Sequence, residues 1–165
     1  MIERLQPGDR APDFSLEADD LTTVSLDALK GRRFVLYFYP HDDTPGCTKQ
    51  ACSLRDEFAS LRALMVDTFG VSPDSVERHR AFREKHALPF RLLADVDHVA
   101  AEAFGVWVSK RNAVSGLDLM GNERTTFVVG PDARIESVIA NVDPELHAAQ
   151  LLDALRTNAA GPAQQ

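Results

Sequence analysis

Cysteine is scarce in this sequence, with two residues among 165, alongside one tryptophan and two tyrosines. Two cysteines cannot build the disulfide framework that stabilises small secreted domains. In a chain of this length we therefore expect the pair to be reactive or incidental, and the residues around each cysteine decide which.

Long apolar segments and an excess of positive charge are also missing. No stretch approaches the ~18 apolar residues of a membrane helix, and residues 1–10 lack the apolar run and cleavage site of a signal peptide. We therefore expect a cytoplasmic protein with no membrane contact. The 18 Lys and Arg residues against 25 Asp and Glu give a net charge of -7. This charge disfavours a nucleic-acid partner, because phosphate binding needs clustered cations.

The composition that is present suits one globular domain. Hydrophobic residues make up 44% and charged residues 26% of the chain, close to globular averages. We expect a single domain over residues 1–156, and a frayed tail over residues 157–165.

Strands are predicted to alternate with helices along the chain. Residues 14–17 and 23–26 alternate apolar with polar side chains, which predicts an N-terminal hairpin at the edge of the fold. The apolar run 34–39 predicts a strand buried on both faces. Apolar spacings of four and three predict one helix from Cys47 to Met65. Further strands are expected at 66–71, 90–94, 125–129 and 134–140, and further helices at 97–104, from Ser72-Pro73 towards His86, and from Asp143-Pro144 with Leu146, Leu151, Leu152 and Leu155 buried. This order predicts an α/β fold with a central mixed sheet flanked by helices.

The loop after Pro40 leads into the helix that carries both cysteines. If Thr44 is the N-cap, Pro45 is the first helical residue and Cys47 is the third. Unpaired backbone N–H groups and the positive end of the helix dipole stabilise a thiolate there over a thiol. The sequence therefore predicts a reactive cysteine at position 47.

Two neighbours of Cys47 outline a polar pocket for a small oxygen-bearing molecule. Gly46 has no Cβ, so a substrate can approach the exposed amides, and the Thr44 hydroxyl can donate and accept hydrogen bonds. The simpler interpretation is that Thr44 only caps the helix and Cys47 is a buried small apolar residue.

The spacing of Cys52 from Cys47 restricts what the pair can do. In an ideal helix, Cα atoms five residues apart are separated by roughly 8.5 Å. A disulfide needs less than about 7 Å, so the two can bond only if the first helical turn unwinds. A zinc site is disfavoured, because it needs four ligands and the five histidines show no ligand spacing.

The loop resembles the active-site signature of peroxiredoxins, Pro40-x-x-x-Thr44-x-x-Cys47. With Tyr37–Tyr39 before it and Ala51-Cys52 after it, the sequence is similar to the bacterioferritin-comigratory (PrxQ) subfamily. The similarity covers most of the chain and includes Gly8–Phe14, Gly70–Ser72, Leu92–Asp95, Phe104–Trp107 and Arg124–Val129.

The resemblance implies a thioredoxin-like fold and the reduction of hydrogen peroxide and organic hydroperoxides by a peroxidatic Cys47. It implies that Pro40 shields the sulfur, Thr44 holds the peroxide oxygens and Arg124 supports the thiolate and the developing charge. Cys52 falls where this subfamily often places its resolving cysteine. The sulfenic acid formed at Cys47 would condense with that thiol, and a thioredoxin-type reductant would reopen the disulfide. No cofactor or metal is implied, and the family suggests a monomer.

Several alternatives stay open at this point. A disulfide reductase is a distant second, because such enzymes use Cys-x-x-Cys and here four residues separate the cysteines. A non-enzymatic peroxide sensor would react once rather than turn over. Arg55 and Glu57 are read as solvated helix charges rather than partners of Arg124, and His41 as a solvated loop residue. Residues 108–122 depart from the family pattern, which leaves substrate preference and self-association open.

Overall fold

A computed structural model describes residues 3–111, 114–140 and 142–160 of the chain. Strand β3 (Phe34–Phe38) is an inner strand of a seven-stranded sheet, and all five of its side chains are buried. It runs parallel to β4 (Asp67–Ser72) and antiparallel to β8 (Thr125–Val129). The prediction of a strand buried on both faces is confirmed, since a continuous apolar run is what such a position requires.

The sheet is mixed, as the sequence predicts. From one edge to the other its order is β2 (Thr23–Ser25), β1 (Ser15–Ala18), β5 (Arg91–Ala94), β4, β3, β8 and β9 (Ile135–Ala140). Strands β3, β4 and β5 are mutually parallel, and the remaining pairings are antiparallel. The N-terminal hairpin forms one edge, where the alternating pattern of residues 14–17 and 23–26 had placed it.

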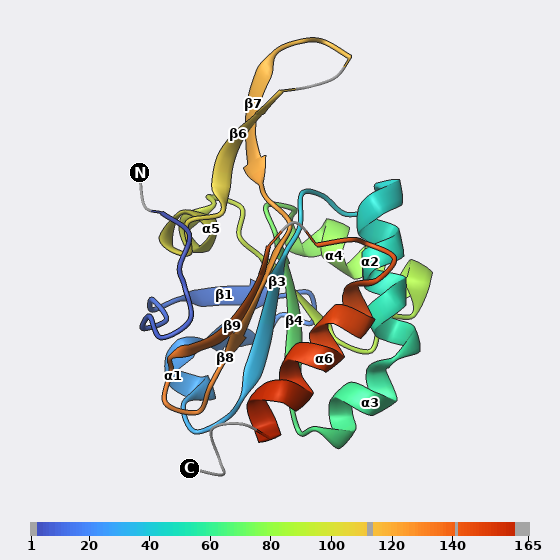
Figure 1. Ribbon diagram of the computed structural model, residues 1–165. Coiled ribbons are helices and arrows are strands. Elements are labelled where there is room, and N and C mark those ends of the chain that lie inside the picture. Colours follow the sequence, from blue (N-terminus) through green and yellow to red (C-terminus); the bar gives the residue numbers. More distant parts are fainter. Residues whose placement is uncertain (1–2, 112–113, 141, 161–165) are drawn as a thin grey trace.

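Helices cover both faces of this sheet (Figure 1). One face carries α2 (Pro45–Asp56), α3 (Phe58–Ala63), α4 (Val76–His86) and α6 (His147–Ala160), and the other carries α1 (Leu26–Leu29) and α5 (Val99–Ala103). Because side chains alternate along a strand, Phe34, Leu36 and Phe38 enter one core cluster while Val35 and Tyr37 enter the other. Cys47 belongs to the second cluster, under the helices that include its own.

The prediction of a single helix from Cys47 to Met65 is wrong, because this segment forms two helices, α2 and α3, that meet at Glu57. Glu57 has φ -107° and ψ 15°, which ends α2 before α3 begins. Leu54 and Leu61 are both buried, so the apolar stripe continues across the break although the helix does not. Met65 is 87% exposed, with a left-handed backbone at φ 57°, and was wrongly assigned to the stripe.

Two predicted helix starts also differ from the structure. Ser72 is the last residue of β4, paired with Ala94 of β5, and the cap of α4 is Ser75, whose side chain accepts from the Arg78 amide. Helix α6 begins at His147 rather than at Asp143, and Leu146 before it is 55% exposed. The same helix continues to Ala160, past the predicted start of the tail, and residues 161–165 lie outside the described residues.

The segment that departs from the family pattern forms a separate hairpin. Strands β6 (Trp107–Arg111) and β7 (Asp118–Asn122) pair only with each other and project from the body of the molecule (Figure 1). Most of their side chains are exposed or half-buried, so the sequence carries little of the apolar alternation that marks a strand. Among the described residues, no helix is both long and apolar enough to span a membrane.

Gly105 offers a test of how tightly the N-terminal segment is packed. Its φ is +76°, and a Cβ there would lie 2.3 Å from the Glu3 carbonyl oxygen and 2.5 Å from the Arg4 Cα atom. Gly8 has a similar φ of +94° but open space around it. We expect Gly8→Ala to lower the free energy of unfolding by about 1 kcal/mol and Gly105→Ala by about 2–4 kcal/mol, because only the second forces backbone apart. Urea unfolding measures both, and equal losses would contradict the close packing.

Candidate active site

The predicted reactive loop follows the carboxyl end of β3 and leads directly into α2 (Figure 1). Thr44 is the N-cap, Pro45 the first helical residue and Cys47 the third, as the sequence predicts. Cys47 is buried, whereas Pro40, Thr44 and Gly46 are half-buried. Because backbone N–H groups in a first helical turn have no intrahelical acceptor, the Cys47 amide is free to bind an oxygen.

Thr44 does not cap the helix with its side chain. Its hydroxyl donates instead to the His41 carbonyl oxygen, with 3.2 Å between the oxygens. The proton of Oγ1 is thus committed, and its lone pairs are left as acceptors. The simpler interpretation, in which Thr44 serves only as a cap, therefore fails for the side chain.

A buried hydrogen-bond network anchors the loop to the sheet. Asp42 accepts a 2.5 Å hydrogen bond from the Tyr39 hydroxyl and lies 2.7 Å from His79 Nδ1, while its backbone amide donates to Asp74 at 2.7 Å. Ser72 donates to the same Asp74 oxygen at 2.6 Å. Fully satisfied buried polar networks rigidify the segments that they join, so this one fixes the loop that presents Cys47.

Asp42, Asp74 and His79 also bring ligand-type atoms within 4.8 Å of one another, a spacing suited to a metal ion. His79 Nδ1 already faces Asp42, however, and His79 Nε2 lies 2.9 Å from the Leu93 carbonyl oxygen. Both imidazole nitrogens therefore have protein partners, and the cluster is accounted for as a hydrogen-bonded anchor.

Arg124, from the end of the projecting hairpin, reaches the first turn of α2. Its Nη1 donates to Gln50 Oε1 at 2.8 Å, and a Cβ added to Gly46 would lie 2.7 Å from its Nη2. The guanidinium therefore packs directly against Gly46, the residue before Cys47. This contact gives Gly46 a role beyond substrate access, because any larger residue there would displace Arg124.

Gln50 is itself held by a buried chain of hydrogen bonds. Because its Oε1 accepts from Arg124, its Nε2 must donate, and that atom lies 3.3 Å from His147 Nδ1. His147 Nε2 then carries the proton and donates to Thr126 Oγ1 at 2.7 Å. Burial, and secondarily the positive charge of Arg124, lowers the pKa of His147 to about 3, so the ring is neutral at pH 7. The neutral tautomer orients Gln50, and Gln50 orients Arg124.

Lys110 of β6 adds a second cation near the sulfur. Its ammonium donates to the Asn122 carbonyl oxygen. Burial lowers the pKa of Lys110, the positive charge of Arg124 lowers it further, and the charge of Cys47 acts in the opposite direction. The base of the projecting hairpin thus contributes two positive side chains to the surroundings of Cys47.

Cys52 lies in the second half of the same α2 helix. Both cysteines are free thiols, and Cys52 is half-buried. The helix is continuous from Pro45 to Asp56, so the pair has the helical separation that prevents a direct bond. The Cys52 sulfur faces His86 Nδ1 of α4 at 3.9 Å.

Three residues of this site were not found from the sequence. Gln50, His147 and Lys110 were absent from the predicted set, which named Arg55 and Glu57 only to set them aside. Arg55 indeed bonds to Asp56 and to the His86 carbonyl oxygen instead of to Arg124. A usable signal existed for Gln50, which is an amide three residues after Cys47 and so lies on the same face of the helix.

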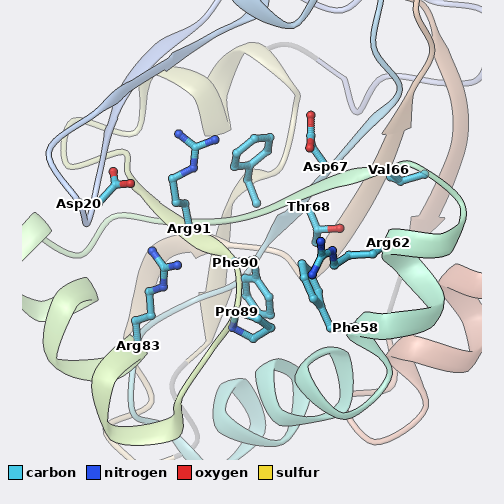
Figure 2. Close-up of a pocket in the computed structure, with 11 residues that line it drawn as sticks. Asp20, Phe58, Arg62, Val66, Asp67, Thr68, Arg83, Pro89, Phe90 and Arg91 are labelled. Carbon is cyan, nitrogen blue, oxygen red and sulfur yellow. The ribbon is translucent and has the colours of Figure 1, made fainter.

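A pocket of about 370 Å³ lies elsewhere, at the amino ends of the parallel strands β4 and β5. Figure 2 shows Phe90 near its centre, with Arg83 and Arg91 on one side and Arg62 on the other. None of the six residues predicted for the site lines it. The predicted site lies instead at the first turn of α2, at the opposite end of the strands.

A cysteine in a first helical turn, with a guanidinium held beside it above a mixed sheet, defines a thiol-based redox site. Residues 7–138 match the AhpC/TSA family. Peroxiredoxin Bcp of Bacillus subtilis (strain 168) is 45% identical over 152 residues, which cover 92% of this chain and 96% of that protein. The chain belongs to the AhpC/TSA family, and its fold is thioredoxin-like.

Solved structures point to the same subfamily. Xanthomonas campestris peroxiredoxin Q superposes with a TM-score of 0.84 at 31% identity, covering 94% of this chain and 97% of that one. A structure of X. campestris bacterioferritin comigratory protein, described for its alkyl peroxide reduction activity, has a TM-score of 0.84 at 30% identity and covers 94% and 98%. The resemblance found in the loop is confirmed, and the chain is a peroxidase that uses a hydroperoxide and a thiol reductant.

Gly46→Ala should separate activity from stability. The added Cβ would displace the guanidinium of Arg124 but no backbone, so we expect the free energy of unfolding to change by less than about 1 kcal/mol. The rate constant for peroxide attack should fall at least about tenfold, because a preorganised donor is moved. Competition kinetics with peroxide measures this rate, and Lys49→Ala, at an exposed position in the same part of α2, is the control. An unchanged rate in Gly46→Ala would contradict the role given to the contact.

His147 should make the protein less stable as the solution is acidified. Its folded pKa of about 3 lies below the ordinary 6.5, so below pH 6.5 the unfolded chain binds a proton that the folded chain does not. Stability from this group is complete above pH 6.5 and declines as the pH falls towards 3. Between pH 7.5 and 5.5 we expect wild type to lose about 1.4 kcal/mol more than His147→Gln, measured by denaturant unfolding. Parallel pH dependences of the two proteins would refute this assignment.

Proposed function

We propose that Cys47 is the peroxidatic cysteine of this peroxidase, and that Cys52 resolves its sulfenic acid as an intramolecular disulfide. The observation that carries the proposal is the placement of Cys47 in the first turn of α2, beside an Arg124 guanidinium held by Gln50. Organic hydroperoxides and hydrogen peroxide are the proposed substrates, and a thioredoxin-type thiol is the proposed reductant.

The first step is attack of the Cys47 thiolate on one peroxide oxygen. The O–O bond breaks, the sulfur becomes a sulfenic acid, and negative charge develops on the leaving oxygen. Arg124 and the free Cys47 amide lie where they can stabilise that charge, and such fixed donors need no reorganisation during the reaction. The lone pairs of Thr44 Oγ1 accept from the peroxide O–H, while Pro40 limits access of water to the sulfur.

The second step requires local unwinding of α2. Cys47 lies in the first turn, which has fewer intrahelical hydrogen bonds than the rest of the helix, whereas Cys52 lies one and a half turns further along. Opening of the first turn would release Cys47 and leave the second half of the helix in place. The resulting short loop permits the disulfide that the intact helix prevents.

Replacement of each cysteine distinguishes the two steps. Cys47→Ser should abolish peroxide consumption, because an alcohol is a far weaker nucleophile than a thiolate. Cys52→Ser should consume one equivalent of peroxide at the wild-type rate and then stop, with Cys47 left as a sulfenic acid. Peroxide loss with and without a thioredoxin system measures both.

Mass spectrometry after one equivalent of peroxide supplies an independent readout. Wild type should lose two hydrogens, located at Cys47 and Cys52. Turnover by Cys47→Ser would overturn the assignment of the nucleophile. Undiminished turnover by Cys52→Ser would overturn the resolving role alone, and a single reaction of wild type without turnover would favour the sensor alternative.

A further inference from the structure

The half-buried thiol of Cys52 lies at the end of a row of three side chains, and the other two, His86 and Asp43, have no part in the steps described so far. Its sulfur is 3.9 Å from His86 Nδ1, within reach of a hydrogen bond to sulfur. His86 Nε2, on the other side of the ring, is buried without a hydrogen-bond partner and lies 3.8 Å from Asp43 Oδ1. Thiol, imidazole and carboxylate thus stand in the order found where a histidine activates a nucleophile.

The carboxylate in this row is fixed and ionised. Lys85 donates to both oxygens of Asp43, at 2.9 and 3.1 Å, and these bonds hold the pKa of Asp43 below its ordinary value. An anionic oxygen beside Nε2 favours the tautomer that carries its proton on Nε2. Nδ1 is then the free acceptor, and it is the nitrogen that faces the Cys52 thiol. The Phe82 ring packs against the imidazole of His86, with 5.2 Å between the ring centroids, and restricts its rotation.

The position of His86 along the chain also suits a helix that must unwind. Asp43 precedes the reactive turn and Cys52 follows it, so both ends of the segment 44–51 contact the same imidazole. Arg55 donates to the His86 carbonyl oxygen at 2.9 Å, which fastens the second half of α2 to the end of α4. When the first turn opens, Cys47 is therefore released between two points that remain beside His86.

We propose that His86 is the catalytic base of the resolving step, with Asp43 as its positioning residue. The proposal rests on the resolving role of Cys52. As the Cys52 sulfur attacks the Cys47 sulfenic acid, its thiol proton passes to His86 Nδ1 and an S–S bond forms. The S–O bond of Cys47 breaks, the departing hydroxide takes up a proton from solvent to become water, and the imidazolium of His86 returns its proton to solvent. The sulfenic sulfur is reduced and the Cys52 sulfur is oxidised, so no further oxidant is needed.

His86→Asn tests this directly, because the amide retains a polar group near the position of Nδ1 but is not basic. The rate constant of the first attack on peroxide should stay within about twofold of wild type. Disulfide formation at pH 7, followed by acid quenching and mass spectrometry, should slow at least about tenfold. The longer-lived sulfenic acid should also give more sulfinic acid at Cys47 under excess peroxide.

The pH profile supplies a readout that a purely structural role would not move. The groups that face His86 are Cys52 and Arg55 of α2, Asp43 of the loop and Lys85 of its own helix. The pH dependence of the resolving rate should differ between wild type and His86→Asn, because wild type has a base beside the Cys52 thiol and the variant does not. In His86→Asn the resolving rate should rise more steeply with pH than in wild type, since solvent must there accept the thiol proton.

His98→Asn is the matched control. This histidine stacks on Trp107 and has a left-handed backbone, which asparagine tolerates, so both steps should keep their wild-type rates. A wild-type resolving rate and pH profile in His86→Asn would overturn the proposal. If Cys52→Ser blocks recycling in the same experiment, the proposed function stands without His86. Unimpaired recycling in Cys52→Ser would instead overturn the resolving role of Cys52, on which the proposal for His86 rests.

If His86→Asn changes the fold, it will slow the attack on peroxide as well as the resolving step. In that event, the test of the proposal is Asp43→Asn. Slower disulfide formation in Asp43→Asn, with an altered pH profile and normal peroxide attack, would support the row of three side chains. Wild-type resolving kinetics in that variant would overturn it.

Discussion

The hydrogen bond from Arg124 to Gln50 is the contact on which the proposed chemistry of this protein depends. It joins two residues 74 positions apart in the chain and holds a guanidinium against Gly46, next to the reactive sulfur. An arginine on a strand end has many conformations in water, and fixing one of them costs conformational entropy. The buried hydrogen bonds that link Gln50, His147 and Thr126 fix this conformation when the protein folds. In the proposed mechanism, the guanidinium charge of Arg124 is therefore already in place before peroxide binds.

In the proposed catalytic cycle, the helix that carries both cysteines is held at its two ends and opens between them. Asp42 fixes the preceding loop through Tyr39 and His79, and the second half of α2 is fastened to α4 through Arg55. Between these anchors lies the first turn, where intrahelical hydrogen bonds are fewest. Local opening is therefore directed to the segment that carries Cys47, and the surrounding sheet and helices need not move.

The histidines around the two cysteines have different roles because their hydrogen-bond partners and neighbouring charges differ. His79 has hydrogen-bond partners at both nitrogens and serves as an anchor. His147 is buried beside a cation, and its lowered pKa keeps it neutral. His86 faces a thiol on one side and a carboxylate on the other. The residue type and the spacing along the chain are not enough to distinguish these cases.

Segments with a marked apolar pattern could be predicted from the sequence, whereas segments whose structure depends on distant contacts could not. The strand at 34–38 could be predicted because a continuous apolar run is typical of a strand buried on both faces of a sheet. The break at Glu57 was missed, since apolar spacing continues across it, and the hairpin of β6 and β7 was missed because few of its side chains are buried.

By itself the sequence determined that Cys47 stands third in a helix after a buried strand, because Thr44 and Pro45 define that helix start locally. It also determined the helical distance that keeps Cys52 from bonding to Cys47. Only the tertiary structure decided which side chains surround each sulfur. Arg124 reaches the site from the link between β7 and β8, and His147 reaches it from the start of α6. His86 comes from the end of α4. Such contacts follow from how elements pack, which local spacing does not encode.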